Sequence, residues 1–101
     1  MPDPRKFPIE RANDTFGTVT DADSIIVVAN VKRADLKIVN DTASIVYLAR
    51  GNVAIAGNGI RLNGNGGVFN MDTVDLFLGD IHAICNQGED SSVTISEGEW
   101  Q

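Results

Sequence analysis

From residue 24 onward, the sequence consists of short apolar runs that are interrupted every few residues by glycine, asparagine or aspartate. Strands commonly span about five or six residues, whereas an amphipathic helix needs an apolar stripe that persists over about a dozen. No window of that length carries such a stripe. The runs therefore predict an all-β fold, with strands at residues 24–31, 35–40, 44–50, 53–56, 59–63, 68–71, 74–79, 81–86 and 93–97.

The densest group of turn-forming residues is the stretch NVAIAGNGIRLNGNGGVFNM, residues 52–71. It matches neither the phosphate-binding loop, which needs Gly-Lys-Ser/Thr at the start of a helix, nor the dinucleotide fingerprint, which needs a third glycine. A calcium loop needs carboxylates, and residues 63–71 contain none. The pairs Asn58-Gly59 and Asn65-Gly66 accept the positive φ that two-residue hairpin turns demand. We interpret the stretch as hairpin turns.

These patterns predict a single antiparallel β-sandwich or jelly-roll-like domain over residues 24–101, since a chain of 101 residues suits one domain. In such a domain, the apolar side of each strand faces a shared core. The predicted core contains Ile26, Val28, Leu36, Ile38, Tyr47, Leu48, Ile60, Leu62, Phe69, Phe77, Ile84 and Ile95.

Residues 1–23 differ from the rest, because all three prolines of the chain lie within the first eight positions. Proline fixes φ and has no amide donor, so this segment favours extended geometry over a helix or a central strand. Its few apolar side chains are widely spaced. We expect an extended N-terminal arm whose apolar residues dock on another surface, and a frayed terminus is the alternative.

The residue types that usually carry chemistry are scarce. His82 is the only histidine and Cys85 the only cysteine, and their odd spacing places them on opposite faces of a strand. They therefore cannot form a nucleophilic pair, and a zinc site would need further ligands. We expect Cys85 in the core, His82 at a surface or edge, and no catalytic residue, metal site or cofactor.

The chain is acidic, with a formal net charge of −6, and all eight lysines and arginines lie at or before Arg61. The acidic remainder would repel a polyanion, so we expect neither nucleic acid nor an anionic membrane as a partner. No apolar run approaches the roughly 18 residues that span a bilayer, and the N-terminus lacks the apolar region of a signal peptide. These features predict a soluble protein that is made in a cytoplasm.

Two further strings are distinctive: IVYLARGNVAIAGNGIRLNGNGGVFNM, residues 45–71, and LFLGDIHAICNQGEDSSVTISEGE, residues 76–99. With the strand before them, from residue 35, they resemble a class of small β-sandwich structural proteins of tailed bacteriophages. Proteins of that class decorate or cement the capsid, or form short head fibres. The resemblance lies in apolar and turn positions and includes no catalytic residue.

The resemblance implies a non-enzymatic virion protein, synthesised in the host cytoplasm, that binds the outside of a phage capsid and stabilises it. Its implied partners are the major capsid protein and further copies of itself, in a trimer. The arm lies outside the resemblance, and we expect it to contact the capsid or a neighbouring subunit through Arg5, Lys6, Phe7, Ile9, Arg11 and Phe16.

Two other functions stay open. The chain is alternatively a head-fibre or tail-associated binding module that recognises a glycan or protein on the host surface, which a concave aromatic patch would support. It is also compatible with a small hydrolase, which would need a pocket that holds two close carboxylates.

Overall fold

Two four-stranded antiparallel sheets make up the fold, which is seen here in a computed structural model that describes residues 11–72 and 75–100. The described residues contain no helix. The strands are β1 (Arg11–Val19), β2 (Ser24–Val27), β3 (Arg33–Asn40), β4 (Val46–Arg50), β5 (Ile60–Leu62), β6 (Gly67–Met71), β7 (Ile81–Cys85) and β8 (Ser91–Glu99).

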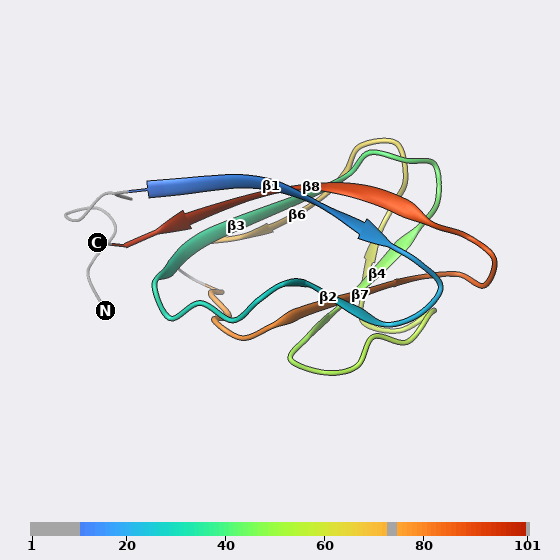
Figure 1. Ribbon diagram of the computed structural model, residues 1–101, viewed down its shortest axis with the longest axis horizontal. Helices are drawn as coiled ribbons and strands as arrows, with labels where there is room; N and C mark the ends of the chain where they lie inside the picture. The colour runs from blue at the N-terminus through green and yellow to red at the C-terminus, as the bar shows by residue number, and fades with distance from the viewer. Residues whose placement is uncertain (1–10, 73–74, 101) are drawn as a thin grey trace.

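The strand order follows a simple rule. Sheet A has the order β1-β8-β3-β6 and sheet B the order β2-β7-β4-β5. Every strand pairs with the one that completes a sum of nine: β1 with β8, β2 with β7, β3 with β6 and β4 with β5. The chain is thus one long hairpin rolled into two layers, which is the jelly roll (Figure 1). The expected fold class is confirmed.

The core fills the space between the sheets, where side chains of alternating parity meet. In β7, Ile81, Ala83 and Cys85 are buried and face inward, while His82 and Ile84 lie on the outer face. The buried cluster comprises Val19, Val27, Leu36, Ile38, Val46, Leu48, Leu62, Met71, Ile81, Ala83, Cys85, Val93 and Ile95. Leu36, Ile38, Leu48, Leu62 and Ile95 were predicted, and Ile26, Ile60, Phe69 and Phe77 pack against the cluster while partly buried.

Three predicted core residues were wrong. Tyr47 and Ile84 have the opposite parity to their buried neighbours, so they point out of sheet B. Val28 lies just beyond the end of β2, where no opposite sheet covers it, and it is exposed. For Tyr47 and Ile84 the apolar run was recognised but its inward side was not, and for Val28 the strand ends one residue earlier.

Two predicted strands do not form. Residues 53–56 belong to a loop between β4 and β5. In the predicted strand 74–79, residue 74 lies outside the described part of the chain, and residues 75–79 are irregular. The turn predictions hold better: Asn65 and Gly66 have φ values of 58° and 97°, and Gly59 has 82°. At Gly59 an added Cβ would lie 2.5 Å from the carbonyl oxygen of Leu48, so the glycine also permits a close approach.

The division between an arm at residues 1–23 and a domain from residue 24 was wrong for residues 11–19, since these form β1. All nine of them pair with β8, from Arg11 with Glu99 to Val19 with Ser91. The strand was missed because the residues on the same side as the buried Val19 are Asn13, Thr15 and Gly17, which give no apolar alternation. Residues 1–10 lie outside the described part of the chain.

Candidate docking surfaces

The outer side of sheet A carries a row of side chains that crosses all four strands. Phe16 of β1 pairs with Thr94 of β8, Thr94 with Val39 of β3, and Val39 with Val68 of β6. Phe16 is 78% exposed and Val68 53% exposed. We call this row, with the next row Asp14, Ser96, Lys37 and Asn70, the sheet A face.

The sheet A face is hollowed beside Phe16. The hollow has a volume of about 540 Å³, and its walls come from β1, β8 and β3. It is lined by Asp14, Thr15, Phe16, Lys37, Val39, Thr94, Ile95 and Ser96. Asp14 supplies its single acid and Lys37 its single base.

A second set of exposed apolar residues belongs to β2 and to the segments that follow β2 and β4. Its exposed residues are Ile25 of β2, Val28 and Val31 in the segment after β2, and Val53 and Ile55 in the loop after β4. Figure 1 shows that loop along the lower side of the molecule, beyond β2 and β7. We call these five residues the sheet B side.

The loop that carries Val53 and Ile55 is held against sheet B by Asp23. The Oδ1 atom of Asp23 accepts a hydrogen bond from the backbone N–H of Ala54 at 2.7 Å and lies 3.0 Å from Nδ1 of His82. Ala54 is buried, so its two neighbours are turned toward solvent. His82 therefore lies on the outer face of sheet B, as expected, and its ring contributes to anchoring the loop.

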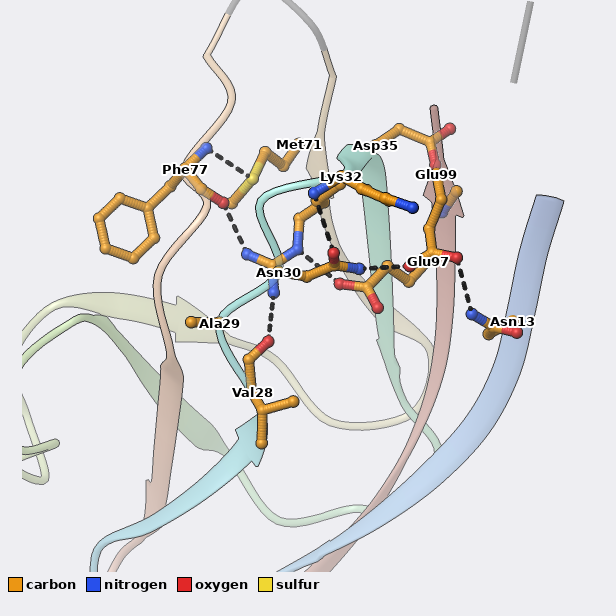
Figure 2. A network of polar contacts seen from close by, with 12 residues as sticks. Asn13, Val28, Ala29, Asn30, Lys32, Asp35, Met71, Phe77, Glu97 and Glu99 are labelled. Atoms are coloured by element: carbon orange, nitrogen blue, oxygen red, sulfur yellow. Dashed lines mark hydrogen bonds and ion pairs between the residues drawn. The ribbon is translucent and has the colours of Figure 1, made fainter. Parts of the chain in front are cut away.

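Arg33, at the start of β3, is a buried charge that sequence reasoning missed. Its side chain has no exposed surface, and its Nε atom lies 2.6 Å from a carboxylate oxygen of Glu97. The guanidinium also donates to the backbone carbonyls of Val28, Phe77 and Gly79. Figure 2 shows Val28, Phe77 and Glu97 converging from three segments. We call this group the Arg33 cluster.

The Arg33 cluster extends to the neighbouring strand ends through the side chains of Asn30 and Asp35. Asn30 donates to Glu99 at 2.7 Å and accepts from the N–H of Lys32, as Figure 2 shows. Asp35 accepts from the N–H of Gly98 at 2.9 Å. These contacts join the ends of β3 and β8 to the preceding loop, so the cluster stabilises one end of the sandwich.

A second buried polar group, Asn40, closes the other end of β3. Its amide nitrogen donates to the carbonyls of Ser44 and Leu62, and its amide oxygen accepts from the hydroxyl of Ser91 at 2.7 Å. The amide thereby organises the turn that leads into β4. Like Arg33, it is bonded within the protein and is not presented to a ligand.

Cys85 is buried in the core, as predicted, and its parity separates it from His82. Burial raises the pKa of the Cys85 thiol, and the acidic side chains of Glu89, Asp90 and Asp21 raise it further. A reactive cysteine needs a lowered pKa and access to solvent. Cys85 has neither, so its role is packing.

Of the predicted contact residues, Phe16 is placed on the sheet A face, and the backbone of Arg11 begins β1. Arg5, Lys6, Phe7 and Ile9 lie outside the described residues. The signal that could have located the sheet A face is the set of outward residues in β1, β3 and β6. Reading it requires the register between strands that are distant in sequence.

Within residues 11–72 and 75–100, no three histidine, cysteine or acidic side chains gather in a group that could hold a metal ion. Nor does any helix in that part of the chain have the length and apolar character needed to cross a membrane. Comparisons with family models, with curated proteins and with solved structures each gave no match.

Proposed function

We propose that this chain is a non-enzymatic structural protein of a tailed-phage particle, where it binds the outside of the capsid and stabilises the shell. One observation carries the proposal: large apolar side chains are exposed on both broad sides of a small sandwich. Phe16 and Val68 lie on the sheet A face, and five more lie on the sheet B side. Apolar surface of this kind marks sites of protein contact.

The disposition of the polar groups supports the same proposal. The guanidinium of Arg33, the amide of Asn40 and the imidazole of His82 each bond to other parts of the fold. Arg33 and Asn40 are fully buried and bonded within the fold, and the Nδ1 atom of His82 is held by Asp23. What the surface offers to a partner is shape and apolar area.

The jelly roll is compatible with the proposal but does not decide it. The same architecture occurs in viral capsid domains, in lectins and in cupins, so the fold alone assigns no activity. The resemblance of residues 35–99 to small phage structural proteins favours the first of these. A lectin-like role would place sugar-binding side chains in a concave site, whereas the hollow beside Phe16 is mainly apolar.

We assign the capsid contact to the sheet B side, because its five exposed residues form the larger of the two apolar sets. Each contact would be repeated at every equivalent site on a shell. Modest individual interfaces then suffice, because several linked contacts bind far more tightly than one.

The test is to purify particles of the phage that encodes this chain and to measure the copy number of the protein by quantitative mass spectrometry. The proposal expects a fixed, stoichiometric ratio to the major capsid protein. A few copies that stay with detached tails would support the alternative binding module instead. Absence from the particle would overturn both.

A binding experiment locates the contact. Purified protein is added to particles from a phage that lacks its gene, and the bound amount is measured after sedimentation. The double variant Val53→Ser/Ile55→Ser should bind at least tenfold more weakly, which corresponds to about 1.4 kcal/mol. Asn58→Ser, in the same exposed loop, is the matched control and should bind like the unaltered protein. Equal binding by all three would exclude the sheet B side.

A further inference from the structure

We propose that β1 is a self-association edge: it pairs antiparallel with β1 of a second copy of this chain and joins the two A sheets into one continuous sheet. A two-fold axis passes through Phe16, so this residue lies opposite Phe16 of the second copy. The inference goes beyond the proposed function, because the isolated protein makes the contact and no particle is needed for it.

The edge formed by β1 is the longest of the four sheet edges and the least protected. The edges are β1 and β6 in sheet A, and β2 and β5 in sheet B. β6 has 5 residues, β5 has 3, and β2 has 4 with a shift in its register. β1 has 9 residues, contains no proline or lysine, and pairs with β8 without a shift. Short strands, prolines, lysines and bulges are the usual protection of an edge, so β1 is the edge that is open to a further strand.

The hydrogen-bond pattern shows which backbone groups of β1 point to this open edge. The N–H of Asp41 donates to the carbonyl of Ser92, which continues the register of β3 with β8. Even-numbered residues of β8 therefore bond to β3, and the odd-numbered ones bond to β1, because direction alternates along an antiparallel strand. Their partners in β1 are also odd-numbered. The backbone N–H and C=O groups of Asp14, Phe16 and Thr18 thus point away from β8, and all three residues are exposed.

Charge selects one register for the second copy. Two even-numbered residues must lie opposite each other to exchange hydrogen bonds, so the two-fold axis passes through a residue. An axis through Asp14 sets two carboxylates opposite each other, and an axis through Thr15 leaves them on a diagonal of about 7–8 Å. An axis through Phe16 places Asp14 opposite Thr18 and separates the carboxylates by four residues, about 13 Å along the strand. Axes nearer either end of β1 leave fewer residue pairs.

Phe16 gains the most from this register. Its side chain is 78% exposed in the single copy. On the axis, its ring lies beside the same ring of the second copy, and cross-strand aromatic pairs are among those that stabilise a sheet. The row of the sheet A face, which runs from Phe16 through Thr94 and Val39 to Val68, then continues across both copies.

Charge and symmetry favour a second copy over a strand of another protein. The chain has a net charge of −6, which keeps most surfaces of two copies apart, but β1 contains one base and one acid, Arg11 and Asp14. The two edges therefore meet without net repulsion. The contact uses the same surface on both copies, so it closes with two subunits and leaves no β1 edge open. It predicts a dimer, whereas the resemblance implies a trimer.

The first test measures the oligomeric state of the isolated protein by sedimentation velocity over a range of concentrations. The full chain should form a dimer. Phe16→Lys and Phe16→Glu should each weaken dimerisation at least about tenfold, because like charges then lie opposite each other at the axis. An equimolar mixture of the two variants should associate again as a heterodimer, since opposite charges then meet. Val68→Lys is the matched control: Val68 is a 53% exposed apolar residue of the same face, but it lies on β6, so dimerisation should not change.

Three outcomes would overturn the inference. A full chain that stays monomeric at millimolar concentration leaves the edge to a strand of another protein. Equal weakening by Val68→Lys means that the broad face of sheet A, and not its edge, makes the contact. A mixture of Phe16→Lys and Phe16→Glu that does not associate means that Phe16 does not lie on the axis.

The second test fixes the register by disulfide formation in a Cys85→Ala background, with Phe16 intact. One chain carries Asp14→Cys and the other Thr18→Cys, which the register places opposite each other at a Cα separation of about 5.5 Å, within the range of a disulfide. Mixing them should give a disulfide-linked heterodimer on a non-reducing gel. Either variant alone should not form the bond, because four residues separate the two identical positions. A linked homodimer of Asp14→Cys, or no linked heterodimer, would show that this register is wrong.

Discussion

Strand β3 carries two regions that use the same sheet in opposite ways. At its start, the Arg33 cluster is closed: a fully buried guanidinium is bonded to Glu97 and to three backbone carbonyls. Near its end, Val39 lies in the sheet A face, between the exposed Phe16 and Val68. The charged side chain of Arg33 thus stabilises the fold, whereas apolar side chains face outward at the other region.

The difference teaches where to look for function in a chain of this kind. A buried arginine with complete hydrogen bonding is costly to remove but offers nothing to a ligand. An exposed phenylalanine on the outer side of a sheet contributes little to folding, and such a side chain is available for contact with another protein. Mutations in the two regions should therefore separate stability from association.

The largest effect is expected at the closed region. Arg33→Met should lower the free energy of unfolding by about 3–5 kcal/mol, because the carboxylate of Glu97 and the carbonyls would lose their partner. Urea-induced unfolding measures the change. Arg33→Lys keeps the charge but loses the planar fork, so its loss should be smaller. A change below about 1 kcal/mol for Arg33→Met would contradict the importance of the cluster.

A truncation series tests where the sheet ends and the arm begins. Deletion of residues 2–10 should leave the unfolding free energy within about 0.5 kcal/mol, since it spares β1. Deletion of residues 2–16 removes six of the nine pairs between β1 and β8, and should cost more than about 2 kcal/mol. Equal stability of the two variants would show that β1 is not an integral strand.

A smaller effect should appear with pH in the core. Burial raises the pKa of Cys85 above its ordinary value, so the unfolded chain loses this proton at a lower pH than the folded protein does. The contribution of the neutral Cys85 thiol to the free energy of unfolding is fully present below about pH 8.5. It declines as the pH rises toward the pKa of the thiol in the folded state. Urea midpoints at pH 7 to 10 should show this decline. Cys85→Ala serves as the control, and an identical decline in that variant would rule out the thiol as its cause.

The smallest effect on stability is expected at the open region. Phe16→Ser should change the unfolding free energy by less than about 0.5 kcal/mol, because the side chain is 78% exposed. Ile95, which follows the strand partner Thr94 in β8, is buried, and Ile95→Ala should cost about 2–5 kcal/mol in the same assay. A large loss in Phe16→Ser would mean that this residue stabilises its own subunit.

The sequence sufficed for the fold class because its turns are local. Asn65 and Gly66 predict a hairpin turn because both accept a positive φ. Leu36 and Ile38 alternate with Lys37, which shows the inward side of the strand. A continuous apolar run has no such alternation and does not show which side faces the core. Tyr47 and Ile84 were therefore assigned to the wrong face. Strand β1 escaped notice because its inward residues are mostly polar or small.

The candidate surfaces were less accessible to sequence reasoning. Phe16 was expected to make contacts, but its neighbours Val39 and Val68 are 23 and 52 positions away in the chain and meet it only through the register of sheet A. The role of Arg33 depends on carbonyl groups from two loops. No local sequence pattern shows that these groups meet, because they come together only when the long hairpin folds into two layers.

The pairing of Arg11 with Glu99 has a practical consequence. Because the first and last strands end side by side, a short flexible linker could join them and convert the chain into a closed loop of eight strands. New termini could then be opened at the exposed Gly57 and Asn58, where an added side chain at Gly57 meets open space. Such a circular permutant would present fused cargo from the opposite sheet without disturbing the pairing of β1 with β8.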